Sequence, residues 1–148
     1  MAVKPIPEGF HTVTPYIVTN NAGGVLDFVV RAFDAKVHEK MTRDDGTVRH
    51  ATIQIGDSMV MIADGSEKFP SQPVSIYLYV EDTDALYRRG LEAGGTSLME
   101  PADQFYGDRN AGVQDVAGNS WWIATHVEDV SEDEMQRRAA TWMQKSAT

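Results

Sequence analysis

The stretch VSIYLYVEDTDALYRRGLEAGG, residues 74–95, decides the fold of this chain. Residues 74–80 are rich in β-branched, aromatic and aliphatic side chains and predict a strand. Asp82 is a favourable N-cap for a helix over Thr83 to Ala93, and the pair Gly94-Gly95 is typical of a helix end. We therefore expect a strand that leads directly into a helix.

This strand and helix begin a β-α-β-β-β unit that occurs twice. In the second half, further strands are expected near Thr96 to Met99, Ala111 to Asp115 and Ser120 to His126. The first half shows the same order, with a helix after Asn20-Asn21 and strands over Thr12 to Thr19, Lys36 to Arg43, Val48 to Ile55 and Ser58 to Ala63.

A shift of about 61 positions superimposes the two halves without a gap. It pairs Tyr16 with Tyr77, Val25 with Leu86, Ala32 with Ala93, Gly46 with Gly107 and Ala63 with Ala124. Such a series across two helices and several strands indicates an internal repeat. Because each helix covers one face of its own sheet, the other faces are expected to form a concave cup.

These features predict an α+β fold in which two βαβββ modules, about residues 10–66 and 72–127, form a curled mixed-sheet half-barrel cup. A C-terminal helix is expected over about residues 131–145, beginning at Ser131 and carrying Trp142 as a packing anchor. A length of 148 residues is typical of one domain, which we expect to span the whole chain.

Composition excludes several classes of function. The chain has no cysteine, so disulfides, thiolate zinc sites and cysteine nucleophiles are excluded. A formal net charge of -9 argues against nucleic acid as a partner, because phosphate binding needs clustered Lys and Arg. The sequence has no apolar run of signal-peptide or membrane-spanning length, so we expect no membrane partner and a cytoplasmic location.

Strand alternation predicts which side chains line the cup. Residues with the parity of Ser75 should point inward, which gives an aromatic wall of Tyr16, Tyr77, Tyr79 and Trp122. Aromatic walls with polar tips suit flat or amphipathic ligands. The alternative is that these side chains fill a closed core.

Alternation over Val48 to Ile55 places His50, Thr52 and Gln54 on the cup side as further ligand-binding candidates. His50 is the candidate catalytic residue, because an imidazole can act as a general base near neutral pH. Alternatively, it is a hydrogen-bonded structural group.

The segment Gln104 to Arg109 is expected to be a loop at the rim of the cup. It adds Tyr106 and Arg109 as candidate ligand contacts. The alternative is that an Asp108–Arg109 pair only pins the loop.

The segments VLDF (25–28), YVEDTDAL (79–86) and DVAGN (115–119) resemble the vicinal oxygen chelate superfamily of glyoxalase, bleomycin-resistance and dioxygenase proteins. A closer resemblance to its PhnB-like branch is carried by TPY (14–16), HA (50–51), IGDS (55–58), QFYGDR (104–109) and ATH (124–126). The resemblance covers about residues 10–139 and implies two βαβββ modules around a ligand-binding cup.

In the metal-dependent enzymes of that superfamily, four side chains around the cup hold a divalent ion. The resemblance carries these positions to Thr14, to Met61 or Ile62, to Ser75 and to Trp122. A divalent ion needs several oxygen or imidazole donors at about 2.0–2.3 Å, which these residues do not supply. We expect no cofactor and no metal there, and a divalent metal held by other residues stays open.

The leading hypothesis is a homodimeric, metal-independent protein that binds a small molecule of the antibiotic or aromatic-metabolite type. The alternative is a glyoxalase- or dioxygenase-like enzyme, a lyase or isomerase, that uses relocated metal ligands or His50 as a base. A third reading is a structural or interaction module whose cup is filled by its own side chains. The homodimer is implied mainly by the resemblance, and open sheet edges favour it; the modules of one cup could come from one chain or from two.

Overall fold

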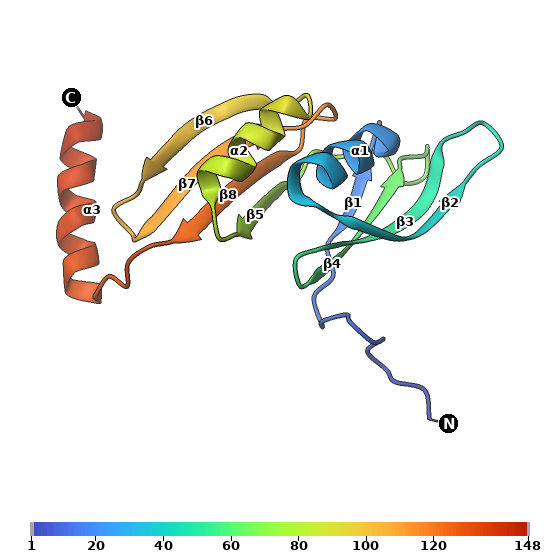
Figure 1. The fold of residues 1–148 in the computed structure, drawn as a ribbon, viewed down its shortest axis with the longest axis horizontal. Coiled ribbons are helices and arrows are strands. Elements are labelled where there is room, and N and C mark those ends of the chain that lie inside the picture. The colour runs from blue at the N-terminus through green and yellow to red at the C-terminus, as the bar shows by residue number, and fades with distance from the viewer. Residues whose placement is uncertain (1, 148) are drawn as a thin grey trace.

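The computed structural model describes residues 2–147 and shows two βαβββ modules followed by a C-terminal helix (Figure 1). The first module comprises β1 (Tyr16–Thr19), α1 (Ala22–Phe33), β2 (Lys36–Thr42), β3 (Val48–Ile55) and β4 (Ser58–Asp64). The second comprises β5 (Ser75–Tyr79), α2 (Thr83–Glu92), β6 (Thr96–Asp103), β7 (Asp108–Gln114) and β8 (Ser120–His126), and α3 (Glu132–Ala147) follows. The predicted α+β fold class is confirmed.

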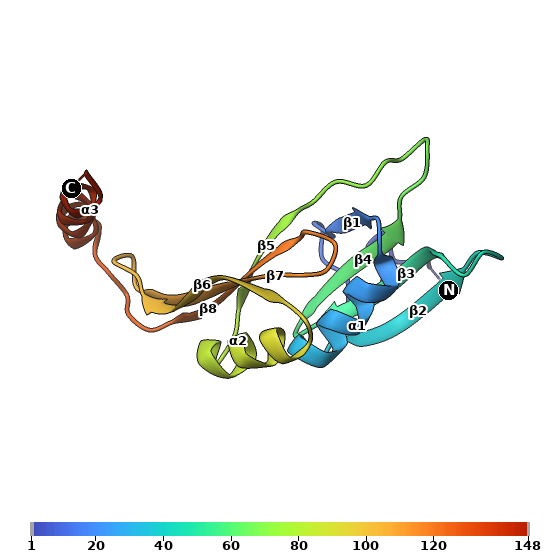
Figure 2. The same cartoon turned by 90° about the horizontal axis from the view of Figure 1, so that it is seen from above.

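Each module forms its own four-stranded mixed sheet, with the strand order β1-β4-β3-β2 in the first and β5-β8-β7-β6 in the second. The β1/β4 and β5/β8 pairs are parallel and the others antiparallel. α1 and α2 each cover one face of the sheet in their own module, and they lie side by side (Figures 1 and 2). Within the described residues no strand pairing joins the two sheets, so both stay unclosed and keep one uncovered face.

Strand register confirms the internal repeat and corrects its spacing. Tyr16 lies opposite Met61 as Tyr77 lies opposite Trp122, which is a shift of 61 positions. On β3 and β7 the shift is 60, because the pair Ala51 and Ile62 corresponds to the pair Ala111 and Ile123. The predicted gap-free alignment, including the Gly46–Gly107 pair, is therefore wrong at these strands. The β7–β8 turn has one residue more than the β3–β4 turn, which restores the shift of 61 positions at β8.

The hydrophobic core extends across both modules. Val25, Phe28 and Val29 of α1 are fully buried, as the helical spacing of apolar residues predicts. The ring of Trp121 on β8 lies with its centroid 6.4 Å from that of Phe28 and 5.5 Å from that of Phe33. A second-module side chain thus completes the packing of the first-module helix.

Asp115 organises the turn between β7 and β8. Its Oδ1 accepts hydrogen bonds from the backbone amides of Ala117 and Asn119, at 2.9 and 3.0 Å. Its Oδ2 accepts from Asn119 Nδ2 at 3.0 Å and from Trp121 Nε1 at 2.9 Å. The segment DVAGN is therefore a turn that satisfies the buried indole of the core.

Two strands begin elsewhere than the sequence predicts. β1 begins at Tyr16 instead of Thr12, because Pro15 has no amide hydrogen and only its carbonyl joins the sheet, accepting from Met61 N at 2.9 Å. β7 begins at Asp108 instead of Ala111, although Asp and Asn are poor strand formers. Tertiary hydrogen bonds of Asp108 and Asn110 offset that preference.

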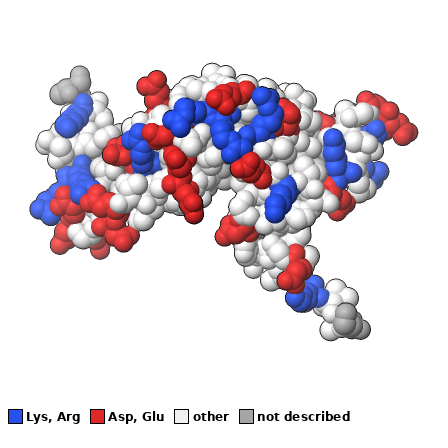
Figure 3. Space-filling model, in the orientation of Figure 1, with Lys and Arg blue, Asp and Glu red and all other residues white. Residues whose placement is uncertain are grey.

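α3 stands at one end of the molecule, apart from the two sheets (Figures 1 and 2). Its first turn is capped by Ser131, whose Oγ accepts from the amide of Glu134 at 3.2 Å. The Trp142 ring lies 5.7 Å from that of Phe105, so Trp142 anchors the helix as expected while remaining half exposed. Acidic side chains gather where α3 begins, and basic and acidic groups are interspersed over the face in Figure 3.

Candidate small-molecule binding site

Three aromatic side chains lie on the face of the second sheet that α2 leaves uncovered. Tyr77 and Tyr79 on β5 are exposed there, whereas Ile76 and Leu78 pack against the core, as strand alternation predicts. Trp122 on β8 lies across Gly112 of β7: a Cβ at position 112 would be 2.5 Å from Cζ3 of the indole. Glycine at this point makes room for the ring.

A cavity of about 330 Å³ opens on this face. It is lined by three aromatic rings, two amides and one thioether, those of Tyr77, Tyr106, Trp122, Gln104, Asn110 and Met99. The predicted ligand-binding residues Tyr77, Tyr106 and Trp122 are thus brought together. Trp122 is held in place by a hydrogen bond of 3.0 Å from its Nε1 to Ser75 Oγ.

A buried carboxylate lies beneath the aromatic wall. Asp108 is 4% exposed and accepts hydrogen bonds from Tyr77 Oη at 2.8 Å, from Tyr79 Oη at 3.0 Å and from His126 Nδ1 at 3.0 Å. Burial raises the pKa of Asp108, but hydrogen bonds from His126, Tyr77 and Tyr79 outweigh it and hold this pKa below its usual value. The carboxylate is therefore ionised at neutral pH.

The same contacts shift the pKa of the partner groups. Hydrogen bonds to Asp108 and to Asp129 raise the pKa of His126, which increases its protonated fraction at neutral pH. Burial, together with the hydrogen bond to Asp108, raises the pKa of Tyr77. Tyr77 is therefore a neutral hydrogen-bond donor throughout the physiological pH range.

The open face of the first sheet carries hydrogen bonds between imidazole, hydroxyl and amide groups. His50 Nδ1 lies 3.1 Å from Tyr16 Oη, and its Nε2 lies 3.0 Å from Thr52 Oγ1. Gln54 Oε1 lies 2.8 Å from His38 Nε2. The predicted residues Tyr16, His50, Thr52 and Gln54 do share this face, and both ring nitrogens of His50 are engaged by hydroxyl groups.

Arg109 and Tyr79 depart from the predicted cup lining. Arg109 belongs to the helix-facing side of β7, where its Nε and Nη2 bind the carboxylate of Asp84 on α2 at 2.8 and 2.9 Å. Its Nη1 lies 3.2 Å from Asp103, so the predicted Asp108–Arg109 pair is wrong. Tyr79 shares the open face but does not line the 330 Å³ cavity.

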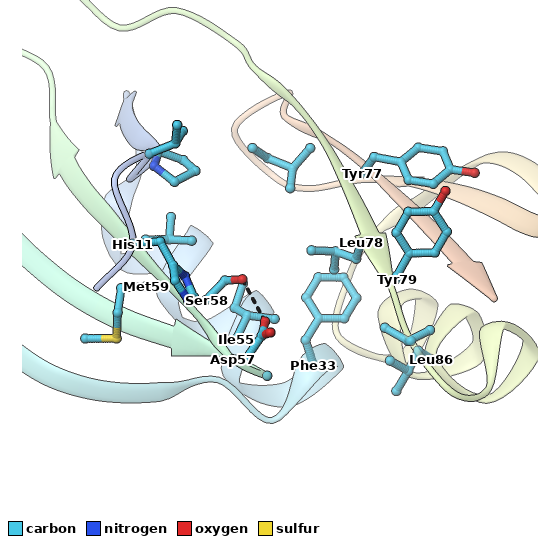
Figure 4. Close-up of a pocket in the computed structure, with 16 residues that line it drawn as sticks. His11, Phe33, Ile55, Asp57, Ser58, Met59, Tyr77, Leu78, Tyr79 and Leu86 are labelled. Carbon is cyan, nitrogen blue, oxygen red and sulfur yellow. Dashed lines mark hydrogen bonds between the residues drawn. The ribbon is translucent and has the colours of Figure 1, made fainter. Parts of the chain in front are cut away.

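The aromatic and polar sets lie on separate sheets, and the cavities lined by Tyr77 are not lined by His50, Thr52 or Gln54. A larger cavity, about 690 Å³, lies between β5, the β3–β4 hairpin and the segment before β1. Leu78 and Phe33 line this cavity, and so do Tyr77 and Tyr79 of β5 (Figure 4).

The four positions that the superfamily uses for a divalent metal do not fit one here. Thr14 Oγ1 donates to a backbone carbonyl, that of His11, and Ser75 Oγ is bonded to the indole of Trp122. Met61, paired with Tyr16, offers only a thioether. Across residues 2–147 no group of three or more His, Asp or Glu side chains is arranged to hold a metal ion.

The sequence analysis missed Asp108, Asn110, Gln104 and His126 as members of this site. Asn110 is 3% exposed, and its amide connects Tyr77, Tyr106 and Gln104. A shift of 60 positions would have found it, because it aligns Asn110 with His50, Ala111 with Ala51 and Gln114 with Gln54.

The family model of the Glyoxalase/Bleomycin resistance protein/Dioxygenase superfamily matches residues 9–123. This match covers well over half of the chain, and the chain therefore belongs to this superfamily. A relative from Mycobacterium bovis, uncharacterized protein Mb0911c, is 35% identical, over 84% of this chain and 89% of the relative. The family resemblance drawn from the motifs is confirmed.

Solved structures share the fold at lower identity. The PhnB protein from Bacillus cereus has a TM-score of 0.62 and 22% identity, over 78% of this chain and 99% of that protein. TnmS3 from Streptomyces sp. CB03234, an antibiotic binding protein, has a TM-score of 0.63 and 19% identity, over 85% of this chain and 98% of that protein. None of the described helices is long and apolar enough to span a membrane.

Proposed function

We propose that this chain binds a small planar organic molecule, an antibiotic or an aromatic metabolite, on the open face of its second sheet without the help of a metal. The observation that carries the proposal is the 330 Å³ cavity, whose wall combines the rings of Tyr77, Tyr106 and Trp122 with the amides of Gln104 and Asn110. Aromatic rings supply stacking area and the amides supply orientation, as in most small-molecule sites.

Two further observations support binding without a metal. The family's metal positions carry hydroxyl, thioether and indole groups, which leaves the cup without a carboxylate or imidazole ligand set. TnmS3, which shares this fold, is itself an antibiotic binding protein.

A homodimer is the proposed assembly. Within the described residues one side of each of β1, β2, β5 and β6 is unpaired, and the 690 Å³ cavity beside β5 is lined by apolar side chains that include the exposed Val13. A second copy would cover these surfaces. Light scattering tests this: we expect the dimeric mass for the wild type and for Val30→Glu on α1, and the monomeric mass for Val13→Glu, which changes an exposed side chain of this cavity.

Thermal-shift screening with planar antibiotics and metabolites tests the binding proposal. A ligand at 100 times its Kd adds about 2.7 kcal/mol, which for a chain of this size raises the Tm by roughly 5–10 °C. We expect such a shift for the wild type and for the control Tyr16→Phe, and its loss in Trp122→Leu. The proposal fails if no compound stabilises the protein while an equimolar divalent metal does.

A further inference from the structure

The hydrogen bonds on the second sheet have a fixed direction, and Asp108 sets it. An ionised carboxylate can only accept hydrogen bonds, so the hydroxyl of Tyr77, 2.8 Å away, must donate its proton to Asp108. The Tyr77 oxygen is then left as an acceptor, and it receives a hydrogen bond from Asn110 Nδ2 at 3.0 Å. The buried charge thereby determines which way the Asn110 amide faces.

The orientation of Asn110 in turn fixes the next two groups. Its Nδ2 donates a second hydrogen bond to Tyr106 Oη at 2.7 Å, and its Oδ1 accepts from Gln104 Nε2 at 3.0 Å. Asn110 is almost fully buried and both ends of its amide are engaged, so reversing it would leave polar groups mismatched.

Two residues that line the cavity can each form one more hydrogen bond, Tyr106 as a donor and Gln104 as an acceptor. Tyr106 accepts from Asn110, and its own proton has no acceptor within the described residues. Gln104 donates to Asn110, and its Oε1 receives no hydrogen bond from them. The cavity that Trp122 lines thus has one free donor, on Tyr106, and one free acceptor, on Gln104, and each of these residues is bonded to a different end of the Asn110 amide.

We infer that the ligand carries a neutral, planar carboxamide, lactam or imide edge, with its carbonyl oxygen on Tyr106 Oη and its N–H on Gln104 Oε1. This inference rests on the proposed function and specifies the ligand class of the same cavity. A carboxylate fits less well, because it has no proton for Gln104 and approaches the negative charge of Asp108. An ammonium has no acceptor for Tyr106.

Three probes with one ring and different polar ends test the inference: benzamide, benzoate and benzylamine. Their affinities for the full chain are measured by ligand-observed NMR titration at neutral pH. We expect benzamide to bind at least tenfold more tightly than the other two, because only it satisfies both free groups. Equal or tighter binding of benzoate overturns the inference.

Two variants check the assigned contacts. Tyr106→Phe removes the free donor and should weaken benzamide binding about fivefold to tenfold, with little effect on benzylamine. Tyr79→Phe is the matched control: Tyr79 also donates to Asp108 but has no bond to Asn110, so the preference for benzamide should persist. An unchanged benzamide affinity in Tyr106→Phe overturns the inference.

The variant Asp108→Asn tests whether the Asp108 carboxylate fixes the hydrogen-bond directions at Tyr106 and Gln104. Thermal unfolding checks that the variant is folded. The new Asn side chain can donate as well as accept, so it no longer forces Tyr77 to donate. The hydrogen bonds from Tyr77 through Asn110 can then reverse, and the preference for benzamide over benzoate should fall severalfold. Retention of the full preference overturns the role of Asp108.

If planar antibiotics bind against Trp122 but the three probes bind alike, the inference alone fails; if neither antibiotics nor probes bind, the proposed function fails with it.

Discussion

The open faces of the two sheets differ although the modules share one fold. At equivalent positions, β3 carries His50 and Thr52 while β7 carries Asn110 and Gly112. The first pair is hydrogen-bonded in series with Tyr16, through imidazole and hydroxyl groups. In the second module, Asn110 is linked through Tyr77 to a buried ionised carboxylate, and Gly112 leaves space for an indole.

The difference shows how one repeated unit becomes specialised. A buried charge restricts which neighbours can donate and which can accept, so the second face has one hydrogen-bond arrangement. On the first face, the hydroxyl groups of Tyr16 and Thr52 can each donate or accept, so this face is less constrained. We expect the second module to be more sensitive to substitution than the first, and the following changes test this from the largest expected effect to the smallest.

The largest effect is expected from Asp115→Ala in the β7–β8 turn. The change leaves the buried Trp121 Nε1 and the buried Asn119 amide without their acceptor, which should lower the free energy of unfolding by about 3 to 5 kcal/mol. Urea denaturation measures it. Asp57→Ala in the β3–β4 turn is the control: its carboxylate contacts only the exposed Ser58 hydroxyl, so the change should stay within about 0.5 kcal/mol. Equal losses in both variants would contradict the asymmetry.

A smaller loss is expected from Gly112→Ala. The new Cβ would lie 2.5 Å from the Trp122 ring, which must move, at a cost of about 1 to 3 kcal/mol. Denaturation gives the loss, and a changed tryptophan emission spectrum reports the displaced indole. Gly23→Ala on α1, where a Cβ meets nothing within 4 Å, should instead be neutral or stabilise by up to about 1 kcal/mol. Unchanged stability and emission in Gly112→Ala would show that the ring does not lie there.

Tyr16 and Tyr77 occupy equivalent positions and give the most direct comparison. Tyr77→Phe removes a hydrogen bond to a charged, buried acceptor and should cost about 1 to 2 kcal/mol. Tyr16→Phe removes a hydrogen bond to His50 at the surface and should cost about 0.5 kcal/mol or less. Equal costs in denaturant unfolding would mean that Asp108 does not distinguish the two faces.

Much of the fold was predictable from the sequence because it depends on local patterns. The repeat of strand, capped helix and three strands follows from apolar periodicity, from Asn21 and Asp82 as N-caps and from glycine-containing turns. The parity of β5 and β8 correctly placed Tyr77, Tyr79 and Trp122 on the open face.

The rest of the site could not be predicted, because it depends on contacts between residues distant in sequence. Asp108 and Asn110 are poor strand formers, so β7 was expected to begin at Ala111 and the preceding residues were treated as a loop. That error hid the alternation that turns both side chains to the open face and Arg109 to the helix side. His126 gave no signal either, since its partner Asp108 is 18 residues away.

The smallest expected effect is a dependence of stability on pH that arises from His126 on the second sheet. Hydrogen bonds to Asp108 and to Asp129 raise the pKa of His126 in the folded state, so folding favours its protonated form. This stabilisation is complete below the unfolded pKa of about 6.5 and is lost as pH rises through the raised folded value. The Tm measured from pH 6 to 9 should therefore contain a decline that His126→Gln removes and Asp108→Asn reduces. Tyr16→Phe changes a hydrogen bond on the first sheet and should leave the decline in Tm unchanged. If the decline persists in His126→Gln, it arises from other groups.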